Sequence, residues 1–287
     1  MPTTPAPPEP PIEMPPARTL RVPGRGELFL RDTGGDGPVV MLLHGWLATA
    51  DLNWWSAYGA LTDAGYHVLA IDHRGHGRGL RPLAPFRLAE CAADTAAALR
   101  QLDVAPATIV GYSMGGAIAQ LVARDHPDVT GAVVLSGTAQ HWQEPESRRV
   151  WRAMGAFGFA LSVAPRLAYR SGFRRAGLRD PRRTAWLLSE LERHSAHDVA
   201  EAGRELGRFD SRPWLQSVKV PAAVVVTSRD SAVSPRKQRE LAAALNASVF
   251  ESAIDHLEVS MPGTDFNGAL LQAIETVRTG DRAAAVR

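Results

Sequence analysis

The sequence is short of cysteine and of long apolar runs. Its single cysteine, Cys91, excludes an intrachain disulfide, and the helical pattern around it predicts a buried, inert thiol. The longest uncharged apolar stretch, residues 153–165, is too short to span a bilayer. The proline-rich start does not read as the apolar segment of a signal peptide, so residues 1–18 are predicted to form a disordered leader. We therefore expect a cytoplasmic protein.

Over the chain as a whole, neither positive nor negative charge is in large excess. Lys and Arg number 32 against 30 Asp and Glu, which leaves a formal net charge of +2. So small an excess does not predict nucleic-acid binding, and no nucleic-acid-binding module is recognisable. With 45% hydrophobic and 22% charged residues, the chain has the composition of an ordinary globular protein.

What the sequence does contain is an alternation of short apolar, β-branched runs with helical patterns. This alternation predicts an α/β fold built on a mostly parallel, doubly wound sheet. The expected strands are 39–43, 68–71, 108–110, 132–135, 222–227 and 248–251. The expected helices are 53–64, 88–102, 114–125, 236–245 and 264–278.

The alternation stops once, between Gly137 and about Pro213, where helical patterns continue without a convincing strand. Such an insertion predicts a helical cap over the carboxyl ends of the strands, where ligands bind in open α/β sheets. The expected division is a core of residues 19–136 and 214–278, a cap of residues 137–213, and a flexible tail of residues 279–287.

A G-x-S-x-G motif at residues 111–115 places Ser113 between an expected strand and an expected helix. The spacing alone is weak evidence, because it arises often by chance, but the strand–turn–helix context makes it specific. On such a turn a serine hydroxyl is exposed, the glycines permit close backbone approach, and the helix N-terminus offers an N–H to a developing oxyanion. The motif therefore predicts Ser113 as a nucleophile.

A serine nucleophile needs a general base, and the base needs an orienting acid. His256 is the best placed of the nine histidines, because it follows the last expected strand and precedes the closing helix. Asp230 follows the strand at 222–227, which gives the chain order Ser, Asp, His. Asp255 is the rival acid, but neighbouring side chains usually diverge, so it is poorly placed to hold His256.

Taken together, these segments resemble the α/β-hydrolase superfamily over residues 19–278, in particular its small esterases, lactonases, cofactor-free perhydrolases and C–C hydrolases. The resemblance implies an oxyanion hole formed by the backbone N–H groups of Trp46 and Met114. It also implies that Gly45 lets that loop approach the reacting carbonyl. A serine at position 113 excludes the haloalkane dehalogenases and epoxide hydrolases of this fold, which would carry an aspartate there. The matching segments are 44–46, 72–77, 111–116 and 230–235.

The sequence therefore predicts a serine hydrolase that cleaves a carboxylic ester, or a related acyl bond, of an apolar small molecule through an acyl-enzyme. Trp46 and Trp142 are expected among the apolar walls of the substrate site. His44, His73 and His76 lack a recognisable metal-ligand spacing, so neither a metal nor another cofactor is expected. Thioesterase, lactonase, C–C bond hydrolase and perhydrolase activities stay open, as does a ligand receptor on a hydrolase scaffold.

Arginine is concentrated in the expected cap, where ten arginines between residues 145 and 183 are opposed by only two acidic residues. An uncharged apolar run, residues 153–165, lies among them. One interpretation is a lid whose apolar side covers the site while its arginines face water. The other is a weak contact of the cap with an anionic membrane surface, involving Arg174, Arg175, Arg182 and Arg183.

Overall fold

The computed structural model describes residues 8–175, 181–261 and 263–280. The side chains of residues 146, 171–175 and 181–183 lie outside this description. Residues 1–7 of the predicted leader and residues 281–287 of the predicted tail also lie outside the described residues.

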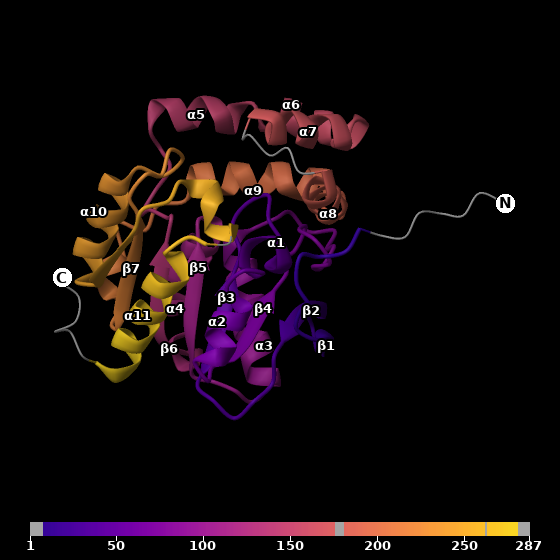
Figure 1. Ribbon diagram of the computed structural model, residues 1–287. Coiled ribbons are helices and arrows are strands. Elements are labelled where there is room, and N and C mark those ends of the chain that lie inside the picture. The colour runs from indigo at the N-terminus through magenta and orange to yellow at the C-terminus, as the bar shows by residue number, and fades with distance from the viewer. Residues whose placement is uncertain (1–7, 176–180, 262, 281–287) are drawn as a thin grey trace.

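A sheet of eight strands forms the centre of the described part of the protein (Figure 1). The strands are β1 (Ala17–Val22), β2 (Gly26–Asp32), β3 (Val39–Leu43), β4 (His67–Ile71), β5 (Ala107–Tyr112), β6 (Thr130–Ser136), β7 (Ala222–Thr227) and β8 (Ser248–Ser252). Their order across the sheet is β1-β2-β4-β3-β5-β6-β7-β8. Every neighbouring pair from β4 to β8 is parallel, so the predicted mostly parallel sheet is confirmed.

The first two strands, β1 and β2, are antiparallel and were not expected from the sequence. Because β1 begins at Ala17, the leader predicted to extend to residue 18 is too long. The carbonyl of Pro16 already accepts a hydrogen bond from the N–H of Asp32, at 3.0 Å. Only Leu20 and Val22 of β1 are buried, and this short alternation at the sheet edge is a weaker signal than a fully buried run.

Side chains of the central strands alternate between two apolar layers, because successive residues of a strand point to opposite faces. In β3, Met41 and Leu43 face one layer, and Val40 and Leu42 face the other. The first layer is covered by α3 (Leu88–Gln101), α4 (Met114–Asp125) and α10 (Pro235–Leu245), and the second by α2 (Tyr58–Asp63) and α11 (Phe266–Thr279). Helices therefore cover both faces, as a doubly wound sheet requires.

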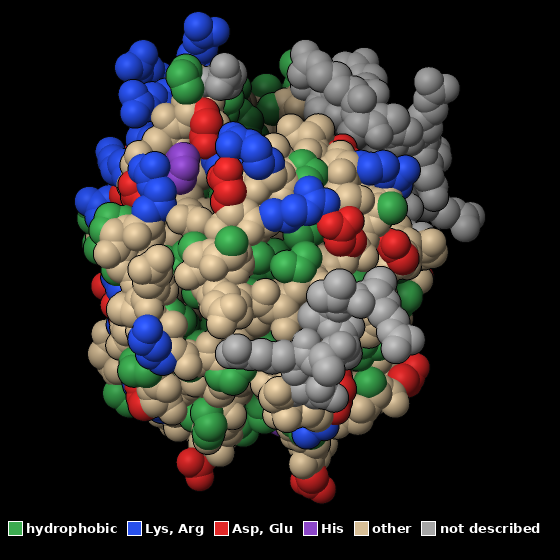
Figure 2. Space-filling model, turned by 90° about the vertical axis from the view of Figure 1, so that its left-hand side faces the viewer, with side chains coloured by type: hydrophobic (Ala, Val, Ile, Leu, Met, Phe, Trp, Pro, Cys, Tyr) green, Lys and Arg blue, Asp and Glu red, His purple; other side chains and the backbone are tan. Residues whose placement is uncertain are grey.

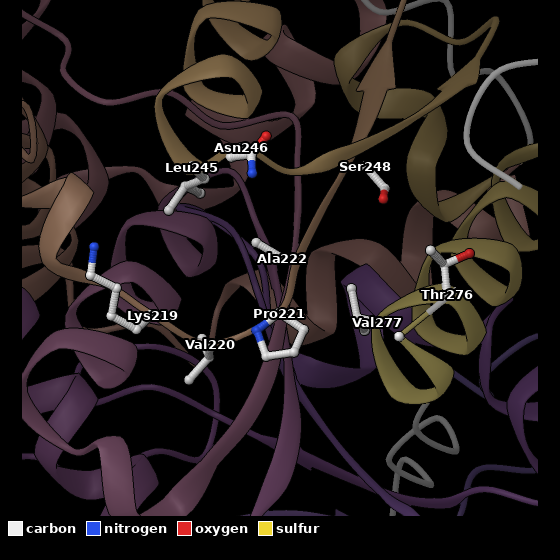
Figure 3. A pocket seen from close by; sticks show the side chains of 10 residues that line it. Lys219, Val220, Pro221, Ala222, Leu245, Asn246, Ser248, Thr276 and Val277 are labelled. Atoms are coloured by element: carbon white, nitrogen blue, oxygen red, sulfur yellow. The ribbon is translucent and has the colours of Figure 1, made fainter. Parts of the chain in front are cut away.

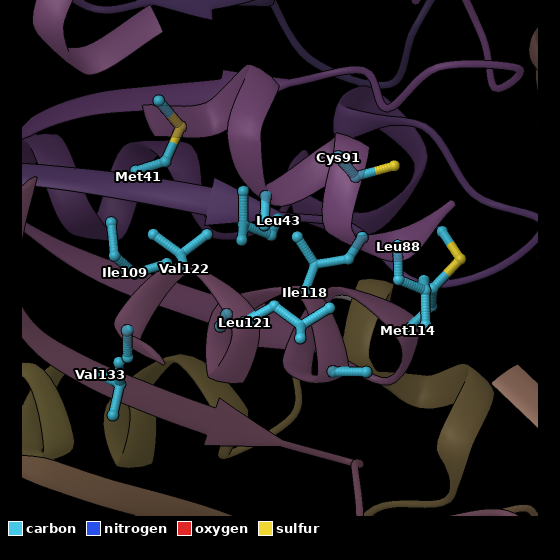
Figure 4. Close-up of a cluster of buried hydrophobic side chains, with 14 of the residues drawn as sticks. Met41, Leu43, Leu88, Cys91, Ile109, Met114, Ile118, Leu121, Val122 and Val133 are labelled. Atoms are coloured by element: carbon cyan, nitrogen blue, oxygen red, sulfur yellow. The ribbon is translucent and has the colours of Figure 1, made fainter. Parts of the chain in front are cut away.

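One detail of the core differs from the sequence-based expectation, and one agrees with it. The helix expected at 53–64 is broken into α1 (Ala50–Trp54) and α2, and the Thr49 side chain caps α1 by accepting from the N–H of Leu52. Cys91 is fully buried on α3, as predicted. Figure 4 shows it in the first apolar layer, close to the side chains of α4.

The predicted cap is helical and lies across the carboxyl ends of the strands (Figure 1). We call these helices the cap: α5 (Pro145–Arg152), α6 (Met154–Val163), α7 (Pro165–Arg175), α8 (Pro181–Leu191) and α9 (Ala196–Arg208). Arg174, Arg175, Arg182 and Arg183 belong to α7 and α8, but their side chains are among those not described. Among the helices that the structure describes, none combines the length and the apolar character that a membrane span requires.

Both apolar and charged contacts join the cap to the core. Trp186 of α8 packs edge-on against Trp55, with the ring centroids 6.4 Å apart. Nearby, the guanidinium of Arg78 contacts Glu190 of α8 at 3.0 Å and Asp51 of α1 at 2.9 Å. The α8 side of the cap is therefore tied to the loops that follow β3 and β4.

The two ends of the cap insertion meet at its base. The N–H of Ser211 donates to the carbonyl of Gln140 at 2.9 Å, and His141 forms an isolated antiparallel bridge with Asp210. The strands on either side, β6 and β7, are parallel neighbours in the sheet. The chain thus leaves the core and re-enters it at almost the same place.

Replacement of Ile118 by alanine should destabilise the core. Ile118 is fully buried on α4, between the sheet and α3 (Figure 4), so truncation leaves a cavity. We expect a loss of about 2–5 kcal/mol in the free energy of unfolding, measured by chemical denaturation. Leu83→Ala is the control, because Leu83 is fully exposed and its loss should cost less than about 0.5 kcal/mol. Equal losses for the two variants would contradict this account of the core.

Candidate active site

Ser113 occupies a sharp turn between β5 and α4. Its backbone has φ 54° and ψ −116°, a conformation that non-glycine residues rarely adopt. The Thr138 hydroxyl, two residues past the end of β6, donates to the Ser113 carbonyl at 2.8 Å and so holds the turn. The helix can start this close to the sheet only because residue 115 is glycine: a Cβ there would overlap the carbonyl oxygen of Leu43. The turn therefore presents the Ser113 hydroxyl above the carboxyl ends of the strands.

His256 reaches Ser113 from the other end of the sequence. It opens a short 3₁₀ helix, η3 (His256–Ser260), and its Nε2 lies 3.1 Å from Ser113 Oγ. The hydroxyl of Tyr112 donates to the His256 carbonyl at 2.6 Å. Tyr112, the residue before Ser113 in the motif, thus fixes the backbone of His256.

The Asp230 carboxylate completes this arrangement. Its Oδ2 lies 2.8 Å from Nδ1 of His256, and its side chain is completely buried. Its Oδ1 accepts from the N–H groups of Ala232 at 2.9 Å and Val233 at 2.7 Å, and Oδ2 accepts from the Thr227 hydroxyl at 2.6 Å. A buried carboxylate needs such donors, because without them its desolvation would be costly.

Asp255, the rival acid, serves the neighbouring loops instead. Its Oδ1 accepts from the N–H of Ser231 at 2.7 Å, and its side chain caps η3 in a reciprocal pair with Glu258. Burial alone would raise the pKa of Asp255, but hydrogen bonds from Ser231 and the His256 N–H outweigh it and hold the pKa below its usual value. The carboxylate that the structure brings to Nδ1 of His256 is that of Asp230.

The loop after β3 closes over Ser113 from the opposite side. A Cβ on Gly45 would come within 3.2 Å of the Ser113 Cβ, so the backbone passes unusually close to the hydroxyl. The Gly45 N–H donates to Oδ1 of the buried Asn53 at 2.9 Å. The N–H groups of Trp46 and Met114 donate to no other group among the described residues. Both are therefore available to a ligand beside Ser113.

Several known proteins are similar to this chain in sequence and in fold. A family model described as the alpha/beta hydrolase fold matches residues 38–167. The chain is 30% identical over 187 residues to 3-oxoadipate enol-lactonase 2 of Acinetobacter baylyi, covering 63% of this chain and 67% of the lactonase. The protein belongs to the α/β-hydrolase superfamily. The family inferred from the motifs is thus confirmed.

Further relatives match different shares of this chain and differ from one another in activity. The enol-lactonase of Burkholderia xenovorans LB400 has a TM-score of 0.69 and 25% identity, covering 91% of this chain and 98% of that structure. A non-heme chloroperoxidase of Streptomyces lividans is 38% identical over 110 residues, which is 38% of this chain and only 40% of the peroxidase. These relatives identify an α/β-fold hydrolase and leave its substrate open.

The two tryptophans expected to contact substrate have different surroundings. Trp46 is half-buried beneath the cap, where its Nε1 donates to the Val199 carbonyl at 2.8 Å and its ring packs against Trp151 and Phe157. Trp142 is buried at the base of the cap, with its ring 5.8 Å from that of Phe209. Trp46 therefore joins the loop after β3 to the cap, whereas Trp142 packs at the base of the cap.

Sequence reasoning missed a set of polar residues that position the predicted ones. They are Asn53, Tyr112, Thr138, Thr227 and Gln238. Tyr112 lies inside the serine motif and Thr227 ends a predicted strand. Their places in the sequence could therefore have indicated that they lie close to the site. Asn53 and Gln238 offered none, because only the folded chain brings them near the site. Gln238, on α10, has its Nε2 3.3 Å from Asp230 Oδ2 and 2.7 Å from the Thr227 hydroxyl.

Other features lie apart from the serine. In the described part of the chain, no group of three or more His, Cys, Asp or Glu side chains is arranged to hold a metal ion. A pocket lined by Lys219, Pro221, Asn246 and Thr276 lies where β7 begins, at the opposite end of that strand from Asp230 (Figure 3). It therefore belongs to the amino edge of the sheet, away from the reacting groups.

Three buried histidines, His44, His73 and His76, and the partly buried His194 form a cluster next to the loop that follows β3. The ring centroids of His44 and His73 are 4.4 Å apart, those of His44 and His76 are 5.4 Å apart, and those of His76 and His194 are 5.2 Å apart. His44 Nδ1 lies 2.8 Å from the carbonyl of Gly45. Burial lowers the pKa of His44 to about 4 and that of His76 to about 3, and it lowers the pKa of His73 and His194 well below the usual value. The four imidazoles are therefore neutral at neutral pH.

The stability of this hydrolase should fall in acid. His44 and His76 titrate near 6.5 when unfolded and near 4 and 3, respectively, when folded, so below about pH 6.5 the unfolded chain binds more protons. The free energy of unfolding should therefore be highest above that pH and decrease towards pH 4. His76→Asn, which retains a donor for the Arg74 carbonyl, should make the decrease shallower in urea titrations at several pH values. The exposed His197→Asn is the control, and an unchanged slope in His76→Asn would contradict the assignment.

Proposed function

We propose that this protein is a serine hydrolase that cleaves carboxylic esters of apolar small molecules through an acyl-enzyme. The observation that carries the proposal is the unbroken set of contacts from Ser113 Oγ to His256 Nε2, at 3.1 Å, and from His256 Nδ1 to Asp230 Oδ2, at 2.8 Å. A nucleophile, a base and an orienting acid in this relation can activate a hydroxyl at neutral pH.

Acylation follows from these positions. As Ser113 Oγ attacks the acyl carbon, its proton passes to Nε2 of His256, and Asp230 holds the Nδ1–H and stabilises the imidazolium. The carbonyl oxygen becomes an oxyanion, which the N–H groups of Trp46 and Met114 stabilise. Collapse of the tetrahedral intermediate breaks the ester C–O bond, and the leaving alkoxide takes the proton from His256.

Deacylation repeats the sequence with water. His256 removes a proton from a water molecule, the resulting hydroxide attacks the acyl carbon, and the oxyanion again accepts from Trp46 and Met114. Ser113 then leaves and recovers its proton from His256. The net change is one water consumed and one carboxylic acid and one alcohol formed.

The preference for apolar substrates rests on the aromatic side chains between the loop and the cap. The ring of Trp46 lies 5.8 Å from that of Trp151 and 5.7 Å from that of Phe157. An apolar acyl chain beside these rings would leave water, and its burial would contribute about 25 cal/mol per Å². A charged acyl group would lose hydration there without gaining a partner.

A lactone is the second candidate substrate. It is a cyclic ester, so the same groups can open it, and alcohol and acid then remain in one molecule. The lactonase of Acinetobacter baylyi, 30% identical over 187 residues, favours this candidate. A chain-length series of p-nitrophenyl esters beside a series of aliphatic lactones would decide between the two.

Replacement of Ser113 by alanine should abolish hydrolysis and leave the fold intact. Loss of the nucleophile of a catalytic triad lowers kcat by about 10⁴-fold or more. The wild-type protein should also become covalently labelled by a fluorophosphonate probe, and the variant should not. Retention of more than about a tenth of the wild-type rate would overturn the assignment. Binding of esters without turnover or labelling would indicate the receptor alternative.

Asp230 and Asp255 should differ sharply when each is replaced by asparagine. Asp230→Asn removes the acceptor that orients the Nδ1–H of His256, and we expect kcat to fall by about 10³-fold or more. Asp255→Asn serves as the matched control, because it alters a carboxylate next to His256 in sequence that does not contact Nδ1. Steady-state kinetics on one ester would compare the two. The reverse ranking would mean that Asp255 is the acid.

A further inference from the structure

The outer side of the cap carries an unusual set of apolar side chains. Seven large apolar side chains are exposed in the described part of the chain, and four of them belong to α5, α6 and α7. Their exposed fractions are 47% for Val150, 72% for Phe159, 67% for Val163 and 65% for Leu167. Exposed apolar side chains gathered on adjoining helices are typical of a surface that binds another molecule or a membrane.

Helix α6 is apolar on both of its sides. Its inner side packs on α9, where Gly158 lies against Ala200, and Leu161 is 4% exposed. Its outer side presents Phe159 and Val163 to solvent. A helix that is apolar all round is usually buried, whereas a surface helix has a polar outer face. The outer side of α6 is therefore suited to a second apolar contact.

The charge around this apolar centre has one sign. Between residues 145 and 175 the sequence has seven arginines, no lysine and one acidic residue, Glu146. Five of these arginines are exposed, and among the described residues only Arg166 has an ion-pair partner, Glu192. Figure 2 shows Lys and Arg side chains gathered at the top of the molecule, on the side where the cap lies. The five are Arg148, Arg149, Arg152, Arg166 and Arg170.

We propose that these residues form a docking surface for anionic lipid membranes. The outer cap face, as we call it, consists of the apolar side chains Val150, Phe159, Val163 and Leu167 with the five exposed arginines. Lipid phosphates would pair with the arginines, and the apolar side chains would enter the boundary between headgroups and acyl chains. A nucleic acid would satisfy the arginines but leave the apolar centre in water.

The outer cap face lies one helix away from the reacting groups. Phe157, on the inner side of α6, packs against Trp46, whose N–H is one of the two expected to stabilise the oxyanion. A membrane on the outer side would thus place lipid-like esters next to the cap. This step to a substrate source rests on the proposed function, whereas membrane binding itself does not.

Binding is tested by sedimentation of the full chain with vesicles. The wild-type protein should sediment with vesicles that contain phosphatidylglycerol at low salt. It should stay in solution with pure phosphatidylcholine, and also at about 0.5 M salt, where the Debye length is only about 4 Å. The triple variant Arg148→Gln, Arg149→Gln and Arg152→Gln should bind at least about tenfold more weakly.

A charge-matched control separates the outer cap face from overall charge. The triple variant Arg21→Gln, Arg236→Gln and Arg239→Gln removes the same charge from exposed positions on β1 and α10, where the side chains are 84%, 78% and 48% exposed. It should bind like the wild-type protein. For the apolar part, Phe159→Ser with Val163→Ser should weaken binding, and Leu83→Ser, a change at a fully exposed leucine outside the cap, should not.

Each outcome of these experiments either supports the docking surface or overturns it. The proposal is overturned if the wild-type protein does not sediment at low salt, or if the cap variants and their controls lose binding equally. It is also overturned if light scattering shows a dimer that Phe159→Ser dissociates, since the outer cap face would then join two copies. Turnover of a short soluble ester should be unchanged in all these variants. A wild-type protein that binds vesicles but hydrolyses no ester would refute the proposed function and leave the docking surface standing.

Discussion

The site depends on how closely backbone can approach backbone where β3 and β5 end. A side chain at Gly115 would overlap the Leu43 carbonyl, so that position needs glycine, and a Cβ at Gly45 would make a tight contact of 3.2 Å with the Ser113 Cβ. This contact determines the distance between the start of α4 and the loop after β3. As a result, Ser113 lies directly between the start of α4 and the loop after β3, without any long side chain separating them. Rigid backbone groups of this kind need no rearrangement when charge develops.

Two buried polar side chains near this backbone contact, those of Asp230 and His73, are stabilised in different ways. The Asp230 carboxylate is completely buried, and it is surrounded by donors from Thr227, Ala232 and Val233 as well as His256. Behind the loop, by contrast, both ring nitrogens of His73 are without a hydrogen bond among the described residues. That imidazole stays neutral because burial lowers its pKa. One buried side chain is thus surrounded by hydrogen-bond donors, and the other is kept uncharged by its burial.

The parts predicted from the sequence are those whose physical signal is local. Fully buried strands such as β3 and β7 appear as uninterrupted apolar runs, and their predicted bounds agree with the structure. The edge strand β1 buries only alternate residues and was missed. Ser113 was recognisable from its turn, and Asp230 and His256 from their order along the chain. Asn53 and Gln238 were not, because their roles arise from contacts that only folding creates.

The meeting of the two ends of the cap has an evolutionary consequence. Ser211 and Gln140 are hydrogen-bonded at the point where the chain leaves and re-enters the core, and β6 and β7 on either side are parallel neighbours in the sheet. Segments inserted at such a point can be lengthened, shortened or exchanged between genes without altering strand register. Selection can therefore remodel what lies above the serine while the serine, histidine and aspartate stay in place.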